Sequence, residues 1–375
     1  MAMPLTSDYQ ILIQLIQCEI RPDVSIGAND SHNNSILQQD NILQQDNNIV
    51  RLLSDYSVSQ WQQLFKAAAH QGLLAIVWDA LGKLQPGPGS AERITRQSVA
   101  EQQKIRELRI RWELSVRHIE KVHHRQREAL KELAGIFAES GMRVMVLKGL
   151  GLAQLYPRPS HRECGDLDIY LSGREDSFEK GNEVIRKMGI PVEYDGSKHS
   201  KFYYKGVPVE NHKNFLNVTS TQVDKNLERE LLHILQQQQC GSLELGGVSA
   251  DVPPPDFQMI FLTRHAITHF LASGLVLRHL YDIGIFYAAY AQDVDLLRIE
   301  EILIRESQYK LYRAFLDVLH IFLGMPDDLQ MRRRSVEDGR LAERVLKDNM
   351  PDDPKMRRRS VEEGRLAERV LEDII

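Results

Sequence analysis

The sequence predicts an α+β protein in which a small mixed β-sheet core is flanked by N- and C-terminal helical regions. Along most of the chain, apolar residues recur at three- and four-residue spacing, which is typical of helices with one buried face. Between residues 136 and 217 the pattern changes to short β-branched or alternating runs separated by glycine, which indicates strands. The length of 375 residues is sufficient for two or three hydrophobic cores.

Residues 1–135 are predicted to be mainly helical. Helical spacing of apolar residues begins at 8–22 and returns over 57–83 and 91–140. Between the last two stretches, LQPGPGS at 84–90 contains the proline and glycine residues that interrupt helices. We therefore expect several separate helices before the sheet begins.

Residues 136–217 are predicted to form the α/β core. Five runs have the composition of strands, and they lie at 143–147, 166–171, 192–195, 201–205 and 207–210. Helical spacing is found at 150–156 and 175–188, between the first strands of this series. Because strands and helices are mixed over so short a distance, we expect one small sheet with helices packed against it.

Residues 218–324 are predicted to form a helical C-terminal domain, divided by three consecutive prolines at 253–255. Beyond it, the segment 325–348 recurs at 350–373 with 20 of the 24 paired positions identical. Two copies are fewer than the roughly three repeats that a repeat domain needs to support itself. We therefore predict a duplicated charged helical tail over 325–375.

Composition and charge restrict the class of protein. The formal net charge of −5 provides no general attraction for nucleic acid. Cys18, Cys164 and Cys240 are few and odd in number, which argues against a disulfide framework or a cysteine zinc site and favours the reducing cytoplasm. No apolar run approaches the ~20 residues that a membrane span requires, so no membrane association is expected.

The motif that points to chemistry is GDLDIY at 165–170. Asp166 and Asp168 are separated by one residue, so on a strand both side chains project from the same face. Gly165, directly before them, lets the backbone approach a ligand closely. Two such carboxylates can bind Mg²⁺ together with substrate phosphates, although an isolated pair of this kind is commonly a solvated strand edge.

The surroundings of this motif follow a particular order. A strand, RVMVL, is followed by Lys148-Gly149, a short helix, a loop with Arg162, the GDLDIY strand, and a later strand that carries Glu210 and His212. From about Met142 to His212 this order resembles the uncharacterised nucleotidyltransferase family of the polymerase-β-like superfamily. Weaker similarity continues in HAITHF at 265–270 and LRHLYDIG at 277–284.

The resemblance implies transfer of a nucleoside monophosphate from an NTP such as ATP to an acceptor, with release of pyrophosphate. It also implies catalytic and metal-binding roles for Asp166, Asp168 and Glu210, with two Mg²⁺ or Mn²⁺ ions as cofactors. Lys148 and Gly149 stand where the superfamily usually has Gly-Ser, which is a departure from its pattern. A lysine between a strand and a helix can still contact phosphate, because the first backbone N–H groups of the helix lie beside it.

Arg162 and Gly165 complete the expected nucleotide-binding set, and His212, on the same strand face as Glu210, is expected either to orient a carboxylate or to have no role in the site. Arg162 and Lys148 also have a structural interpretation, in which they are solvated or only neutralise carboxylates. His265 and His269 have the spacing of metal ligands on a helix, but Ala266 occupies the glutamate position of a zinc-protease motif. For these two histidines we expect packing or supporting roles.

The acceptor is expected to be a small molecule or a protein side chain rather than RNA, because no basic strip with interleaved aromatic residues is present. The alternative to an enzyme is a catalytically silent protein of the same fold with a binding or regulatory role. The missing Gly-Ser pair and the duplicated segments favour that alternative. A phosphotransferase that uses the same nucleotide would differ by releasing a nucleoside diphosphate.

Overall fold

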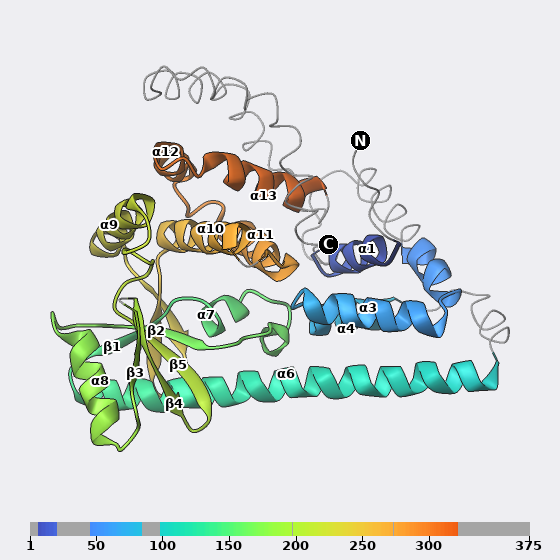
Figure 1. The fold of residues 1–375 in the computed structure, drawn as a ribbon, viewed down its shortest axis with the longest axis horizontal. Helices are drawn as coiled ribbons and strands as arrows, with labels where there is room; N and C mark the ends of the chain where they lie inside the picture. Colours follow the sequence, from blue (N-terminus) through green and yellow to red (C-terminus); the bar gives the residue numbers. More distant parts are fainter. Residues whose placement is uncertain (1–6, 21–45, 85–97, 197, 273, 322–375) are drawn as a thin grey trace, which may run out of the picture.

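The computed structural model describes residues 7–20, 46–84, 98–196, 198–272 and 274–321 (Figure 1). In these residues, helices surround one mixed sheet of seven strands, which confirms the predicted α+β class. The duplicated tail predicted for 325–375 lies outside the described residues.

The N-terminal part is helical, as predicted for the described residues before 136. Its helices are α1 (Ser7–Ile20), α3 (Val58–His70), α4 (Leu74–Lys83) and α6 (Val99–Glu139). A further helical stretch, not expected from the sequence, lies at 46–54. The starts of α3 and α6 are set by Ser57 and Ser98, because each serine forms a capping box with the residue three positions later.

The sheet has the strand order β3-β4-β5-β2-β1-β7-β6. Its strands are β1 (Arg143–Val146), β2 (Leu167–Ser172), β3 (Glu193–Asp195), β4 (His199–Tyr204), β5 (Val207–His212), β6 (Gly241–Glu244) and β7 (Ser249–Val252). β2 pairs in parallel with β5 and in antiparallel with β1, while β1 pairs in parallel with β7. All five strands predicted from the sequence are therefore present.

The two faces of the sheet have different neighbours because side chains alternate along each strand. One face buries Leu167, Ile169 and Leu171 of β2 against α6 and α8 (Ser177–Lys187). On the other face Tyr170 packs on Phe215 with ring centroids 4.6 Å apart, and Phe215 continues the contact to α10 (Pro255–Ala272). Asp168 of β2, and Glu210 and His212 of β5, lie on this second face, whereas Asn211 of β5 lies on the first and donates to Asn182 of α8.

The chain after residue 217 forms both helices and strands. Its helices are α9 (Gln222–Gln237), α10, α11 (Leu277–Tyr290), α12 (Leu296–Arg305) and α13 (Tyr309–Ile321). The strands β6 and β7 lie in the part predicted to form a helical domain, and they extend the sheet beside β1. Gly246 and Gly247 have positive φ in the tight turn between them, and Leu243 and Ala250 are buried in the same core as β2.

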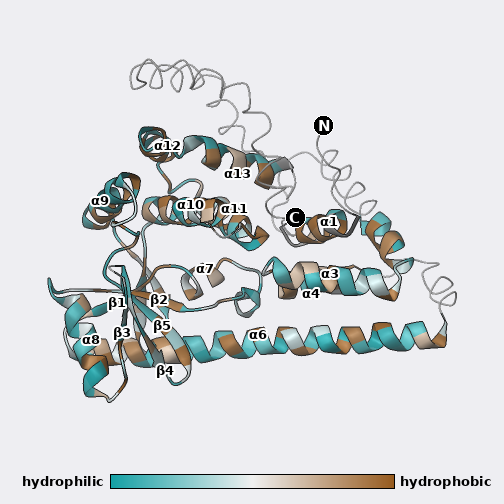
Figure 2. Cartoon of the chain, viewed as in Figure 1, coloured by the Kyte–Doolittle hydropathy of each residue, from teal (hydrophilic) through white to brown (hydrophobic). Residues whose placement is uncertain are grey.

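The helix α6 is 41 residues long and runs beside both halves of the molecule (Figure 1). Trp112 and Val116 belong to the core of the helical regions, whereas Leu133 and Phe137 belong to the core beneath the sheet. The boundary expected at residue 135 therefore lies inside one continuous helix. Figure 2 shows polar and apolar residues mixed along α6, and none of the described helices is long and apolar enough to cross a membrane.

Candidate active site

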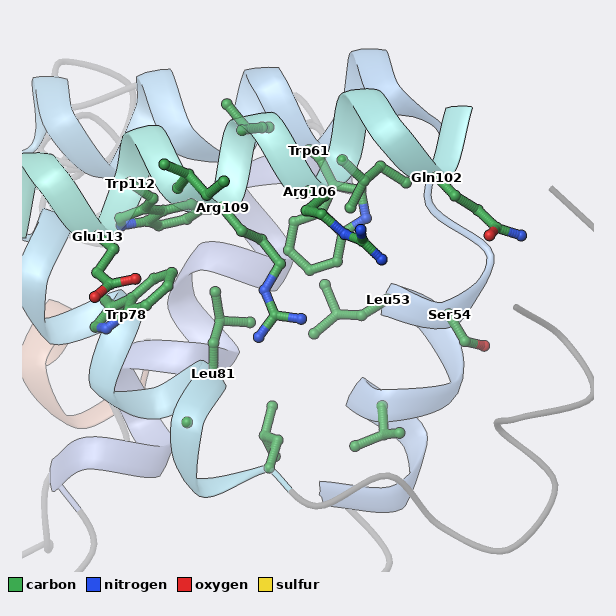
Figure 3. A pocket seen from close by; sticks show the side chains of 16 residues that line it. Leu53, Ser54, Trp61, Trp78, Leu81, Gln102, Arg106, Arg109, Trp112 and Glu113 are labelled. Carbon is green, nitrogen blue, oxygen red and sulfur yellow. The ribbon is translucent and has the colours of Figure 1, made fainter. Parts of the chain in front are cut away.

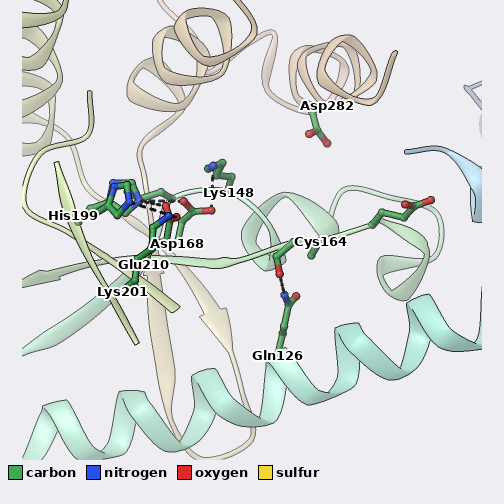
Figure 4. Close-up of polar contacts among 12 residues, drawn as sticks. Gln126, Lys148, Cys164, Asp168, His199, Lys201, Glu210 and Asp282 are labelled. Carbon is green, nitrogen blue, oxygen red and sulfur yellow. Dashed lines mark hydrogen bonds and ion pairs between the residues drawn. The ribbon is translucent and has the colours of Figure 1, made fainter. Parts of the chain in front are cut away.

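Two parallel neighbouring strands bring predicted site residues to one face of the sheet. β2 and β5 pair so that Asp168 lies opposite Glu210 and Tyr170 lies opposite His212. Neighbouring strands are about 4.8 Å apart, and alternate residues share a face. Asp168, Glu210 and His212 therefore project together from the face that Tyr170 shares, and Figure 4 shows Asp168 and Glu210 grouped there with Lys148.

Asp168 is a buried carboxylate held by two partners. Its side chain is only 7% exposed, with Lys148 Nζ 3.2 Å from Oδ2 and His212 Nε2 3.0 Å from Oδ1. Burial acts to raise the pKa of Asp168, but Lys148 and His212 outweigh it and hold this pKa far below its usual range. Asp168 is therefore ionised at neutral pH, as a cation ligand must be.

Asp166 lies directly before β2 and is exposed. Its pKa is raised by partial desolvation and then by the charges of Glu210 and Asp168, against a smaller effect of Lys201 and Lys148. Desolvation is the largest cause of this shift, and the second reflects the negative charges of Glu210 and Asp168 near Asp166. A divalent cation among these three acids would offset their negative charges.

Glu210 contacts basic residues from the neighbouring strand β4. Its Oε1 lies 3.0 Å from Lys201 Nζ and 3.5 Å from His199 Nε2. These contacts follow from the strand register, in which Lys201 lies opposite Glu210 and His199 opposite His212. Neither His199 nor Lys201 was predicted as a site residue. The sequence HSKFYY shows which of its residues share a face, but it does not show that this strand pairs with the strand that carries Glu210.

The turn after β1 carries Lys148 and Gly149. Gly149 has φ +54° and ψ −112°, a backbone conformation in the left-handed region that favours glycine, and it precedes α7 (Leu150–Ala153). A Cβ atom at this position would lie 3.9 Å from the carbonyl oxygen of Asp166, so the turn is packed beside the acids. This packing brings Lys148, whose side chain is 21% exposed, to Asp168.

Arg162 is not directed at the carboxylates of β2 and β5. Its Nε and Nη2 donate to the two oxygens of Asp282 on α11, at 2.9 and 2.7 Å. Figure 4 shows Asp282 well apart from the group around Asp168. The guanidinium is 5% exposed and also donates to Cys164 Sγ at 3.1 Å. These contacts favour the structural interpretation, in which Arg162 fixes the loop before β2 to α11.

Gly165 leaves room beside the acids. Its carbonyl accepts a hydrogen bond of 2.6 Å from Gln126 Nε2 on α6, which holds the backbone before β2 (Figure 4). Within the described residues, nothing lies within 4 Å of the position that a Cβ atom would take. A ligand can therefore approach the backbone at this point.

Lys198 is a further basic residue at the site that the sequence did not indicate. Its pKa is lowered by burial and by the charge of Lys148, against the opposing effect of Asp168, Glu210 and Glu228. Lys198 therefore interacts electrostatically with Asp168, the same carboxylate that pairs with Lys148. No sequence pattern indicated Lys198 as a site residue, because it lies in the turn before β4 and comes near β2 only in the folded protein.

A cavity of about 820 Å³ lies elsewhere, between α3, α4 and α6 (Figure 3). Trp61, Trp78 and Trp112 line it together with Arg106 and Arg109. None of the predicted site residues lines this cavity. This cavity is therefore separate from the carboxylates of β2 and β5.

The donor set of the sheet face fits hard divalent cations. Carboxylate oxygens are the ligands that Mg²⁺ and Mn²⁺ prefer. Asp168 is ionised, and the pKa of Asp166 is raised by desolvation and then by the charges of Glu210 and Asp168, which a cation would offset. Lys148 and Lys201 already pair with Asp168 and Glu210, so a bound cation would compete with these lysines.

Comparison with known proteins gives one family and one solved structure. Residues 57–324 match the model of a family described as uncharacterised nucleotidyltransferase. The chain is also similar to the crystal structure of an antigenic nucleotidyltransferase-like protein from Paracoccidioides brasiliensis, with 12% identity and a TM-score of 0.33, over 51% of this chain and 91% of that chain. A comparison with curated proteins found no match.

Proposed function

Because this chain belongs to the uncharacterised nucleotidyltransferase family, we propose that it transfers a nucleoside monophosphate from an NTP to an acceptor and releases pyrophosphate. The observation that supports this most directly is the register of β2 and β5, in which Asp168 lies opposite Glu210 on one sheet face. Asp166 adds a third carboxylate at an exposed position directly before β2.

Asp166, Asp168 and Glu210 would hold two Mg²⁺ or Mn²⁺ ions in this proposal. When bound, such ions lower the pKa of an attacking hydroxyl group and neutralise charge on the leaving pyrophosphate. His212 positions Asp168, since its Nε2 lies 3.0 Å from Oδ1 and its Nδ1 lies 3.2 Å from the carbonyl oxygen of Asn214. The two ring contacts fix the carboxylate in the orientation that a cation requires.

Lys148 and Lys198 are the proposed contacts for the triphosphate. Both lysines interact electrostatically with the buried Asp168, and Lys148 follows directly after the buried residue Leu147 at the end of β1. Phosphate oxygens would replace Asp168 as the partner of Lys148 once cations neutralise the acids. We leave Arg162 out of this set because Asp282 already satisfies its guanidinium.

The acceptor in this proposal is a hydroxyl group of a small molecule or a protein. The net charge of −5 and the mixture of acids and lysines around β2 do not favour a long polyanion such as RNA. A single hydroxyl group requires only the open side of Gly165 and the nearby carboxylates. We propose ATP as the first nucleotide to test.

The experiment is incubation of the full chain with each α-labelled NTP, Mg²⁺ or Mn²⁺ and an extract that contains acceptors. We expect a labelled acceptor and released pyrophosphate, and Asp168→Asn should lower the rate by roughly 100-fold or more because the site loses charge where it acts on the reacting phosphates. Glu244→Gln is the matched control, an exposed acid on β6 of the same sheet, and should leave the rate unchanged.

A catalytically silent binding protein is the second candidate, and the ion pairs Lys148–Asp168 and Lys201–Glu210 favour it. In that case the protein would bind NTP, but no acceptor in the extract would be labelled and no pyrophosphate would be released from the NTP. Release of a nucleoside diphosphate would instead identify a phosphotransferase. Equal rates for the Asp168→Asn variant and the unsubstituted protein would refute a role of the acids in transfer.

A further inference from the structure

Three histidines meet between α10 and α11, apart from the carboxylates of β2 and β5. His265 and His269 are one helical turn apart on α10, and His279 lies on α11. Each offers one ring nitrogen, and these three nitrogens all lie within 4.8 Å of one another. The ring centroids are 4.6 Å apart for His265 and His269, 5.2 Å for His265 and His279, and 4.4 Å for His269 and His279.

One ring nitrogen of this cluster, Nδ1 of His279, is buried without a hydrogen-bond partner among the described residues. His279 as a whole is 9% exposed. A buried polar atom without a partner is costly, and commonly indicates a water or an ion. Imidazole binds a metal ion through the lone pair of an unprotonated ring nitrogen, which would give this buried atom a partner.

We propose that His265, His269 and His279 form a binding site for one divalent d-block cation of the zinc class. Imidazole nitrogen suits zinc, cobalt and nickel, whereas Mg²⁺ prefers oxygen. Three protein ligands also leave a fourth coordination position open. The site goes beyond the proposed transfer reaction and does not depend on it, since it requires no nucleotide and none of the three acids.

The charges around the histidines determine which fourth ligand the cation would take. Lys148 and Arg278 contribute positive charge, while Asp168 and Asp282 contribute negative charge. Lys148 is already paired with Asp168 at 3.2 Å, and Arg278 Nη1 donates to the carbonyl oxygen of Glu163. Asp282 is likewise paired with Arg162 at 2.7 Å, so Arg278 leaves positive potential that favours an anionic fourth ligand, such as hydroxide or a phosphate oxygen.

Packing without a metal is the simpler interpretation of the same cluster. The rings of His269 and His279 are stacked, with an interplanar angle of 27°. Stacked neutral rings can fill space between two helices, but they give no partner to His279 Nδ1. The two interpretations differ in one measurable property, which is the affinity of the full chain for a d-block cation when Mg²⁺ is in excess.

The test is titration of the full chain with Co²⁺ and Zn²⁺ in excess Mg²⁺. We expect one Co²⁺ per chain with the visible absorption of a four- or five-coordinate ion, displaced by Zn²⁺. X-ray absorption of the zinc form of the unsubstituted protein should show three imidazole nitrogens at about 2.0–2.1 Å. This second measurement does not depend on the folding of any variant.

Variants separate this site from the other group that could hold a metal, which consists of His199, Glu210 and His212. His269→Gln should weaken Zn²⁺ binding by roughly 100-fold or more. Mutation of residues that only support metal ligands already lowers metal affinity by about 10- to 100-fold, and His269 would be a ligand itself. His199→Gln should leave it unchanged, as should His233→Gln on the exposed side of α9. No Co²⁺ bound by the unsubstituted protein, or loss of binding only with His199→Gln, would overturn the proposal.

Discussion

At the scale of single residues, Asp282 joins the loop before β2 to α11. It accepts hydrogen bonds from Arg162 and, at 2.7 Å, from the hydroxyl group of Tyr156. Arg162 and Asp282 are each 5% exposed, so neither charge is solvated without the other. Removing one partner of such a pair leaves the other buried and uncompensated, which is more costly than losing an exposed ion pair.

We predict that Asp282→Asn lowers the free energy of unfolding by about 3 kcal/mol or more. Tyr156→Phe removes one hydrogen bond to the same carboxylate and should cost about 1.5–3 kcal/mol. Urea denaturation of both variants checks the order of the two effects. A loss below about 1 kcal/mol for Asp282→Asn would show that water reaches Arg162 in the folded protein.

His161 links α4 to α6 and should make stability depend on pH. Its Nδ1 lies 2.6 Å from Asp79 Oδ2, and its Nε2 lies 3.0 Å from Glu120 Oε1. Burial alone would lower the pKa of His161, but the hydrogen bonds to Asp79 and Glu120 outweigh it and raise this pKa above its ordinary value of 6.5. The protonated ring is therefore favoured in the folded state.

We predict that the stabilisation from protonated His161 is complete below about pH 6.5 and is lost as the pH rises through the higher folded-state pKa. Free energies of unfolding measured from about pH 6 to about pH 9 should fall more steeply for the unsubstituted protein than for His161→Gln. His118→Gln, on an exposed part of α6, is the control and should follow the unsubstituted protein. The prediction would be contradicted if the free energy of unfolding of His161→Gln had the same pH dependence as that of the unsubstituted protein.

At the scale of elements, α8 packs on the sheet through a glycine. A Cβ atom at Gly181 would lie 2.1 Å from Leu171 Cδ1 of β2 and 3.6 Å from Phe137 of α6. Gly135 in α6 is a contrast, because its Cβ atom would meet nothing within 4 Å among the described residues. The same substitution is therefore expected to act in opposite directions in the two helices.

We predict that Gly181→Ala destabilises the protein by about 1–3 kcal/mol, since Leu171 must move within a packed core. Gly135→Ala should stabilise it by about 0.5–1 kcal/mol, because alanine has the higher helix propensity. Chemical denaturation of both variants measures the two changes. Stabilisation by Gly181→Ala would mean that α8 can shift away from β2 without lowering the free energy of unfolding.

At the scale of the whole molecule, α6 contributes to both hydrophobic cores. Trp112 packs with the N-terminal helices and donates from Nε1 to the carbonyl oxygen of Leu74 at 3.0 Å, whereas Phe137 packs beneath the sheet. A second connection is made by Gln258 of α10, which donates to the carbonyl oxygen of Leu147 after β1 at 2.9 Å. Neither core can lose its contacts without affecting a shared element.

We predict that the two cores unfold together. Tryptophan fluorescence reports on the N-terminal helices, because all three tryptophans, Trp61, Trp78 and Trp112, lie in α3, α4 and α6. Hydrogen exchange of peptides from β2 and β5 reports on the sheet. Denaturation followed by the two probes should give coincident midpoints. Midpoints separated by about 1 M urea or more would show that α6 does not couple the cores.

Local patterns in the sequence determined a substantial part of this protein. The β-branched run of β1 and the alternation of β2 placed the strands, and the spacing of Asp166 and Asp168 indicated the carboxylate face. These predictions rest on neighbours along the chain, whose geometry is set by the period of two in a strand. The short strands β6 and β7 have too few residues for their alternation to stand out from helical surroundings.

Only the tertiary structure decided the partners of the site residues. Pairing of β4 with β5 brings Lys201 to Glu210, and the packing of α11 gives Arg162 to Asp282 instead of to phosphate. The same packing adds His279 to His265 and His269. These contacts join residues on different elements, and they are set by the free energy of burying whole elements against one another. The spacing of residues within a single segment carries no record of that free energy.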